Sequence, residues 1–299
     1  MAVSNDAPPR GLLVACLACV YVVWGSTYLA MQFAIVELGP LLLGGARFLL
    51  AGGGLYLIAR RRTTVRPTLR DWVGVLPIGV TLFLGGNGFI GIAVERTSAG
   101  TIPSGTSAVV AAMMPLWAGI LGVFFGVRPT RREVLALVIG FAGILVLARG
   151  PTLKGDPMHI GLLLLAPASW ALGSLLTRSL KSEVSKDPMM LPAMQLIMGG
   201  AVMLLAAPIH GEHVPHHVSW QVGLAFVYLV LIGSLLTFTA YAWLLRNTRP
   251  VVATSYAFVN PTIAVLLGFA LHGEGLGFNV LIANAMMVIA IYLAVAKPS

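Results

Sequence analysis

Long apolar stretches follow one another along the whole chain, and short polar segments between them carry most of the arginines and lysines. A helix needs roughly 17–25 mostly apolar residues to cross a hydrocarbon core about 30 Å thick. The pattern predicts an all-α integral membrane protein with ten transmembrane helices. The predicted spans are residues 12–34, 41–59, 72–93, 103–125, 134–149, 159–178, 189–209, 220–243, 251–271 and 278–296.

The positions of the positive charges agree with this number of spans. If both termini lie in the cytoplasm, fifteen of the 19 Lys and Arg residues fall in cytoplasmic loops and three in outer loops. Such a bias is the positive-inside rule. It accounts for the net charge of +9, so we expect no nucleic-acid partner. Charged residues make up only 10% of the chain, against roughly 25% in soluble domains, which excludes a soluble enzyme.

The chain also repeats itself at a spacing of 146 residues. The spacing separates Trp24 from Trp170, Pro115 from Pro261, and Gly122 from Gly268. We therefore predict two five-helix units, residues 1–150 and 151–299. Because five is odd, the second unit enters the membrane from the opposite side, and the repeats are inverted around a central cavity. Inverted repeats are a common architecture of secondary transporters.

Four segments resemble the EamA-type drug/metabolite transporter superfamily. They are residues 22–28, 86–88, 169–174 and the long run 253–268. The resemblance implies ten helices, cytoplasmic termini and alternating access. Within the superfamily the chain is similar to bacterial inner-membrane exporters of amino acids and related metabolites, including aromatic amino acids. This substrate class rests on the resemblance alone, and other classes of exported drug or metabolite remain the alternative.

The first and sixth spans carry matching polar and aromatic faces. Trp24, Thr27 and Tyr28 share one helical face, and Trp170 and Ser174 repeat the pattern 146 residues later. Polar side chains inside a membrane protein usually face the bundle interior, because lipid offers them no hydrogen bonds. We interpret the two faces as walls of a substrate cavity. A seam of close helix packing is the alternative.

The ninth span adds Tyr256 and Asn260 directly before Pro261. Proline removes a backbone hydrogen bond and disturbs the preceding turn, so its neighbours can line a cavity. We predict that Pro115 and Pro261 act as hinges during transport. Fixed kinks are the alternative, and proline-to-alanine variants that lose transport and abundance equally would favour it.

Two further polar positions lie inside predicted spans. Asn87 offers both donors and acceptors to a zwitterion, and Tyr241 offers a ring to an apolar or ammonium group. A hydrogen bond between helices is the alternative for Asn87. Arg47 is the one full charge well inside a span. It can bind a substrate carboxylate or hold helix-end carbonyls, and we favour the structural role.

Several chemistries are missing from the predicted spans. None has Asp or Glu near its middle, so a carboxylate proton relay is not expected and uniport is the default mode. No nucleophile–base pair, metal-ligand set or nucleotide-binding loop is present, so we expect neither an enzyme nor a cofactor. A channel or a membrane-embedded enzyme is the alternative from another class. The expected partners are a small-molecule substrate and membrane lipid.

Overall fold

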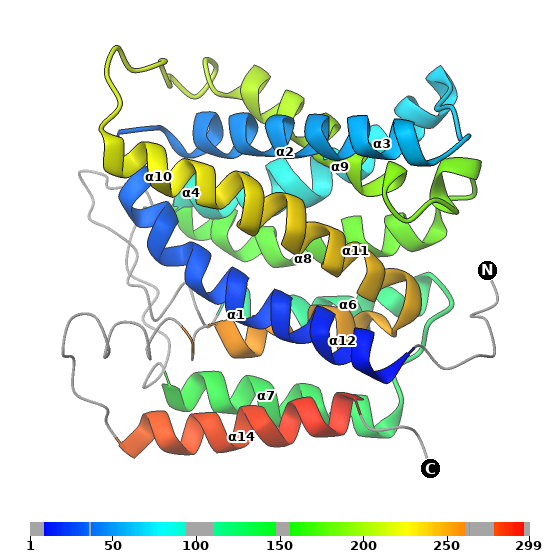
Figure 1. Cartoon of the computed structure of the whole chain (residues 1–299). Coiled ribbons are helices and arrows are strands. Elements are labelled where there is room, and N and C mark those ends of the chain that lie inside the picture. Colours follow the sequence, from blue (N-terminus) through cyan, green and yellow to red (C-terminus); the bar gives the residue numbers. More distant parts are fainter. Residues whose placement is uncertain are drawn as a thin grey trace.

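The computed structural model describes residues 9–35, 37–93, 110–147, 156–260, 263 and 278–295. Every regular element within these residues is a helix, which agrees with the predicted all-α class. The helices lie side by side along a common direction in one bundle (Figure 1). The predicted all-helical class is therefore confirmed for the described residues.

The elements follow the order of the predicted spans. In the first half they are α1 (Arg10–Ile35), α2 (Pro40–Arg62), α3 (Leu69–Gly79), η1 (Val80–Gly88), α4 (Phe89–Ala93), α6 (Met114–Phe124) and α7 (Arg131–Leu147). In the second half they are α8 (Pro157–Ser179), η2 (Glu183–Ser185), α9 (Met190–Ala206), α10 (Trp220–Tyr228), η3 (Leu229–Leu236), α11 (Thr237–Asn247), α12 (Pro250–Thr254) and α14 (Phe278–Val295). A further helical segment, residues 256–260, follows α12 after a turn at Ser255.

Five helical runs are long and apolar enough to cross a membrane. They are Arg10–Thr27, Pro40–Arg62, Leu69–Ala93, Pro157–Ser179 and Trp220–Asn247. Shorter apolar helices cover Met114–Phe124, Met190–Ala206 and Leu281–Ala294. Each predicted span overlaps helix in the described residues, whereas the total of ten crossings stays a prediction.

The third and eighth spans are not regular α-helices, which sequence analysis did not foresee. Each is wound as a π-helix in its middle, over η1 and η3. The amide of Phe89 donates to the carbonyl of Leu84, and that of Thr237 donates to Ile232, five residues back in each case. π-Helical turns are rare and frequently mark functional sites. Here they occur in the corresponding helix of both halves.

Close packing of α2 against α9 joins the two halves. A Cβ atom added at Gly52 would lie 2.8 Å from the amide nitrogen of Ile197. One added at Gly200 would lie 2.6 Å from the amide nitrogen of Leu49. Glycine is therefore required at both positions, because no side chain fits between backbones this close. The pair α7 and α14 makes another extensive contact between the halves.

Some contacts between helices recur when the first and second halves of the chain are exchanged. Helix α8 packs on α3 and η1, and α1 packs on α10 and η3. Helix α9 packs on η1, and α2 packs on η3. The packing of α9 on α3 is a contact of the second half with the first that does not recur in this way.

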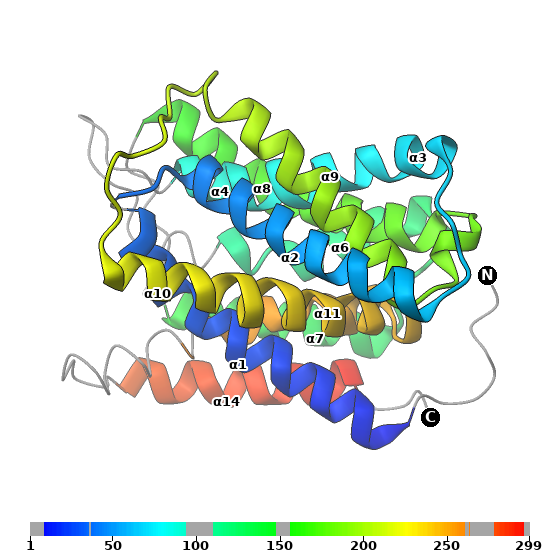
Figure 2. The same ribbon diagram turned by 45° about the horizontal axis from the view of Figure 1, so that its top comes forward.

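The predicted cytoplasmic loops gather at one end of the bundle. Helix α1 begins and α14 ends there, and α2 and α11 end there as well (Figures 1 and 2). At this end Arg249 pairs with Glu133 and Ser182 donates a hydrogen bond to Asp71. These contacts also link the two halves.

Two carboxylates link the halves at the other end. Glu212 accepts the amides of Leu41 and Leu42 at 2.9 and 2.7 Å, at the start of α2. Glu37 accepts the amide of Ser219 at 2.7 Å, before α10. Hydrogen bonds from Ser219 to the charged form lower the pKa of Glu37 below its ordinary value. The stability from this contact is present above the ordinary pKa and is lost as pH falls through the lowered one.

We predict that Glu212→Gln lowers the free energy of unfolding by about 0.5–2 kcal/mol, the range for losing a helix N-terminal cap. Glutamine keeps one acceptor and loses the charge that favours a helix N-terminus. Thermal unfolding in detergent measures the change. Glu183→Gln is the control, because Glu183 pairs with the neighbouring Lys186 at the surface and its side chain is 76% exposed. Equal melting temperatures for the two variants would contradict the prediction.

Candidate functional site

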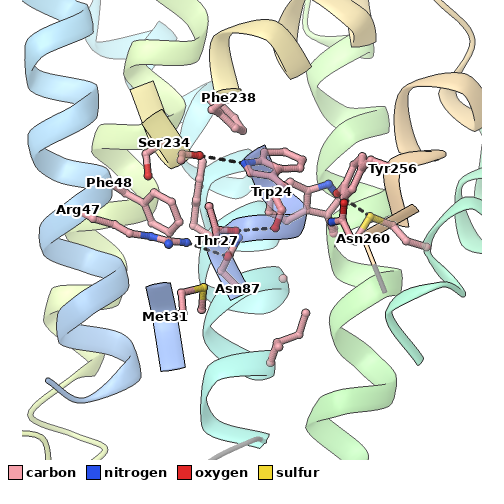
Figure 3. Close-up of a pocket in the computed structure, with 16 residues that line it drawn as sticks. Trp24, Thr27, Met31, Arg47, Phe48, Asn87, Ser234, Phe238, Tyr256 and Asn260 are labelled. Carbon is pink, nitrogen blue, oxygen red and sulfur yellow. Dashed lines mark hydrogen bonds between the residues drawn. The ribbon is translucent and has the colours of Figure 1, made fainter. Parts of the chain in front are cut away.

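A cavity of about 90 Å³ lies between helices from both halves of the chain. Its lining comes from α1, α2, η1, α4 and α6 in the first half and from α8, η3, α11 and residues 256–260 in the second. Figure 3 shows the side chains that surround it. The two π-helical segments both contribute, since Asn87 comes from η1 and Ser234 from η3.

Aromatic rings form one wall of the cavity. The ring of Trp24 lies 5.6 Å from Trp170 and 4.6 Å from Tyr256, both edge to face. Phe83 and Phe238 extend the wall. Trp24, Trp170 and Tyr256 are thus placed together at the edge of the cavity.

Hydrogen bonds hold the two tryptophans in place. The indole of Trp24 donates to the carbonyl of Gly233 in η3 at 2.9 Å, and the indole of Trp170 donates to the hydroxyl of Tyr241 at 2.9 Å. Ser174 also bonds to the Tyr241 hydroxyl, at 2.6 Å. Ser174 and Tyr241 are absent from the cavity lining and lie behind Trp170. Their predicted place on the cavity wall is therefore corrected to a supporting layer.

A polar wall lies beside the aromatic one. Arg47 from α2 donates to the Asn87 side-chain oxygen at 3.2 Å, and both line the cavity. The interhelical hydrogen bond considered for Asn87 is therefore present, with Arg47 as its donor. The sequence interpretation favoured a structural role in which Arg47 donates hydrogen bonds to carbonyls at a helix end. That interpretation is wrong for the described residues, because the only hydrogen bond of Arg47 among them goes to Asn87.

Two further polar atoms of the lining are buried without a hydrogen-bond partner among the described residues. They are Oγ of Ser234 and Oδ1 of Asn260. Thr27, also in the lining, donates back to the carbonyl of Trp24 at 2.7 Å. Buried polar atoms in proteins nearly always have a partner. A solute with polar groups is the natural complement to these atoms.

Two sequence predictions fall outside the described residues. Tyr28 belongs to α1, but its side chain is not described, and Pro261 lies outside the described ranges.

The position of Pro115 is described and differs from the predicted one. It sits in the first turn of α6, after a helix break at Ala112 and Met113, rather than inside a continuous helix. Proline is well tolerated there, because a first-turn amide has no intrahelical acceptor.

Sequence analysis missed Phe83 and Met114 as lining residues. A usable signal existed for Phe83, because it precedes Asn87 by four positions and residues at that spacing are neighbours on a regular helix.

A bundle of apolar helices around a small internal cavity is typical of polytopic membrane proteins. The chain belongs to the EamA-like transporter family, whose sequence profile matches residues 9–149 and 158–296. It is accordingly a membrane transporter of this family, as the resemblance in the sequence implied.

Among similar proteins is the uncharacterized inner membrane transporter YedA of Escherichia coli (strain K12), 36% identical, with 96% of this chain and 94% of that protein covered. The "Probable amino-acid metabolite efflux pump" of Salmonella typhimurium (strain LT2) is 24% identical, with 90% and 91% covered. A solved crystal structure shares the fold with a TM-score of 0.76 at 19% identity, over 96% of this chain and 97% of the other.

Proposed function

We propose that this protein exports small neutral and aromatic amino acids, or related metabolites, across the bacterial inner membrane by alternating access. The observation that carries the proposal is the cavity between the halves, with rings on one side and buried polar groups on the other. The similarity to a protein named as an amino-acid metabolite efflux pump supports the substrate class.

Two inverted five-helix units, residues 1–150 and 151–299, would provide the two conformations. The family profile matches the chain in two consecutive stretches, which supports a duplication. The recurrence of some helix contacts in both halves, such as α8 on η1 and α1 on η3, supports a twofold relation. Helix α1 begins and α14 ends at the same end of the bundle, which supports termini on one side, the cytoplasmic side in our proposal (Figure 1). Exchanging the shapes of the two units would open the cavity to the opposite side.

Different residues of the cavity would contact the apolar and the polar parts of the solute. Trp24, Trp170 and Tyr256 would hold its apolar part, and Asn87 and Asn260 its polar groups. Two further predictions belong to the same proposal. Tyr28 would also contact the solute, and Pro115 and Pro261 would act as hinges during transport. Tyr241 and Ser174 would act by positioning the Trp170 ring.

The size of the cavity favours a small solute. Its volume is about 90 Å³. Pockets for drug-sized ligands are typically about 300–1,000 Å³. Small neutral amino acids therefore need the least adjustment of the walls, and an aromatic side chain requires the halves to separate further.

We expect purified protein in liposomes to take up labelled small neutral and aromatic amino acids down their concentration gradients, without an imposed pH gradient. The described lining contains no Asp or Glu that could carry a proton. Uptake across a labelled amino-acid panel measures this. Empty liposomes and a chain denatured before reconstitution are the controls. Uptake equal to empty liposomes for every amino acid would refute the substrate class, and uptake that needs a pH gradient would refute uniport.

A further inference from the structure

The guanidinium of Arg47 is buried in the cavity wall without an anion beside it. Arg47 is 6% exposed, and its single hydrogen bond among the described residues goes to the neutral side chain of Asn87. Its Nε is buried with no partner there. A guanidinium has five N–H donors, and a buried charge is normally paired. The described ion pairs are Lys186 with Glu183 and Arg249 with Glu133, both at the end of the bundle.

The surroundings of Arg47 leave its donor edge available. The guanidinium carbon lies 4.3 Å from the centre of the Phe48 ring, so the ring covers one face. The hydrogen bond to Asn87 fixes one nitrogen. Stacking on a ring and bonding in the plane are compatible for arginine, because its donors point outward in the guanidinium plane. That plane is the geometry in which arginine binds a carboxylate through two parallel bonds.

Two neutral groups complete a bipolar arrangement. Ser234 Oγ, from a residue only 1% exposed, has no partner in the described part of the chain. Figure 3 places Ser234 on the same side as Arg47, and Asn260 on the other side of Trp24, next to Tyr256. Asn260 Oδ1 is a buried acceptor with no described partner. Donors from Arg47 and Ser234 and an acceptor from Asn260 therefore border the same cavity.

We propose that Arg47, with Ser234, binds the carboxylate of the transported solute, and that Asn260 Oδ1 accepts its ammonium group. Asn87, which also borders the cavity, orients the guanidinium through its hydrogen bond to Arg47. The substrate class is then small monocarboxylates with an apolar substituent, α-amino acids first among them. This inference rests on the proposed transport function, but it also predicts binding that is measurable without transport.

Matched acid and amide pairs test the carboxylate directly. The probes are L-alanine, L-leucine and L-phenylalanine, each against its carboxamide, which keeps the ammonium group and side chain. Binding to purified wild-type protein is measured by calorimetry and by thermal stabilisation. We expect at least one acid to bind about 10- to 100-fold more tightly than its amide, the range for a charge-assisted hydrogen bond. Equal affinity within every pair, or no binding by any acid, overturns the proposal.

Variants assign the preference to Arg47. Arg47→Gln should abolish the difference between acid and amide, while Arg47→Lys should retain part of it, because lysine keeps the charge without the planar fork. Arg70→Gln, on the exposed start of α3, is the matched control and should retain the full difference. A full preference in Arg47→Gln would overturn the assignment. If Arg47→Gln does not fold, the proposal is still tested by the acid and amide affinities of the wild-type protein and of Arg47→Lys.

The two proposals fail in different ways. Acids that bind selectively but are not taken up by liposomes would overturn the transport proposal and support the carboxylate subsite. Uptake of acid and amide with the same KM would support transport and overturn the subsite.

Discussion

Replacing Gly52 with leucine will remove most of the folded protein. The site has no room for a Cβ, which would lie 2.8 Å from the amide nitrogen of Ile197 and 3.0 Å from the carbonyl of Ala193. Both obstacles are backbone atoms of α9, so α2 and α9 must move apart. Overpacking by extra methylenes typically costs about 1–3 kcal/mol, and leucine adds a whole side chain. Because α2 and α9 join the two halves, the loss should affect the whole bundle.

Gly53 supplies the matched control one position along the same helix. A Cβ there meets nothing within 4 Å, so Gly53→Leu adds the same side chain to the same helix without a clash. The yield of monodisperse protein in size-exclusion chromatography, with the melting temperature in detergent, measures both variants. Gly52→Leu with the yield and melting temperature of Gly53→Leu would show that α2 and α9 are not packed as described.

The second large effect is expected from Trp24→Ala, which should reduce transport at least about tenfold. Trp24 is the centre of the aromatic wall, with Tyr241 at 5.1 Å in addition to Trp170 and Tyr256. Aromatic pairs are each worth about 0.5–1.5 kcal/mol beyond burial, and about 1.4 kcal/mol is a factor of ten. Alanine removes three such contacts and the hydrogen bond to Gly233 that links α1 to η3.

Initial uptake rates in liposomes, normalised to reconstituted protein, measure this loss. Trp24→Phe keeps a ring but lacks the indole N–H, so its rate should fall between wild type and Trp24→Ala. Trp220→Ala is the control, because Trp220 begins α10 and is 71% exposed, away from the cavity. A Trp24→Ala rate equal to that of Trp220→Ala would contradict a transport role for the wall.

The all-helical class and the positions of the helices could be predicted from apolar run length alone. The fifth predicted span, 134–149, corresponds to α7 at Arg131–Leu147, and the sixth, 159–178, to α8 at Pro157–Ser179. In lipid every backbone polar group must be bonded within the chain, so a long apolar run has little choice but helix. The apolar run of the fourth span did not predict the helix break before Pro115.

The candidate cavity could be predicted where regular helical spacing holds. Trp24 and Thr27 share a face of α1, and Tyr256 and Asn260 share a face four residues apart, and all four line the cavity. Spacing failed for Tyr241, which is aromatic and inside a span but faces the hydroxyl of Ser174 behind the wall. The spacing of residues along a helix predicts that a side chain points into the bundle, but not whether it borders a cavity or packs against another side chain.

By itself, the amino-acid sequence indicated a membrane environment and an all-helical class, because both follow from the length of the apolar runs and the placement of the charges. It also indicated the family, because the family resemblance lies in local motifs. Only the tertiary structure decided that η1 and η3 are π-helical and that Arg47 faces Asn87 inside a cavity. These features depend on which helices pack together. Contacts between residues as far apart as Trp24 and Gly233 are set by the shape of the whole bundle rather than by any segment of the chain.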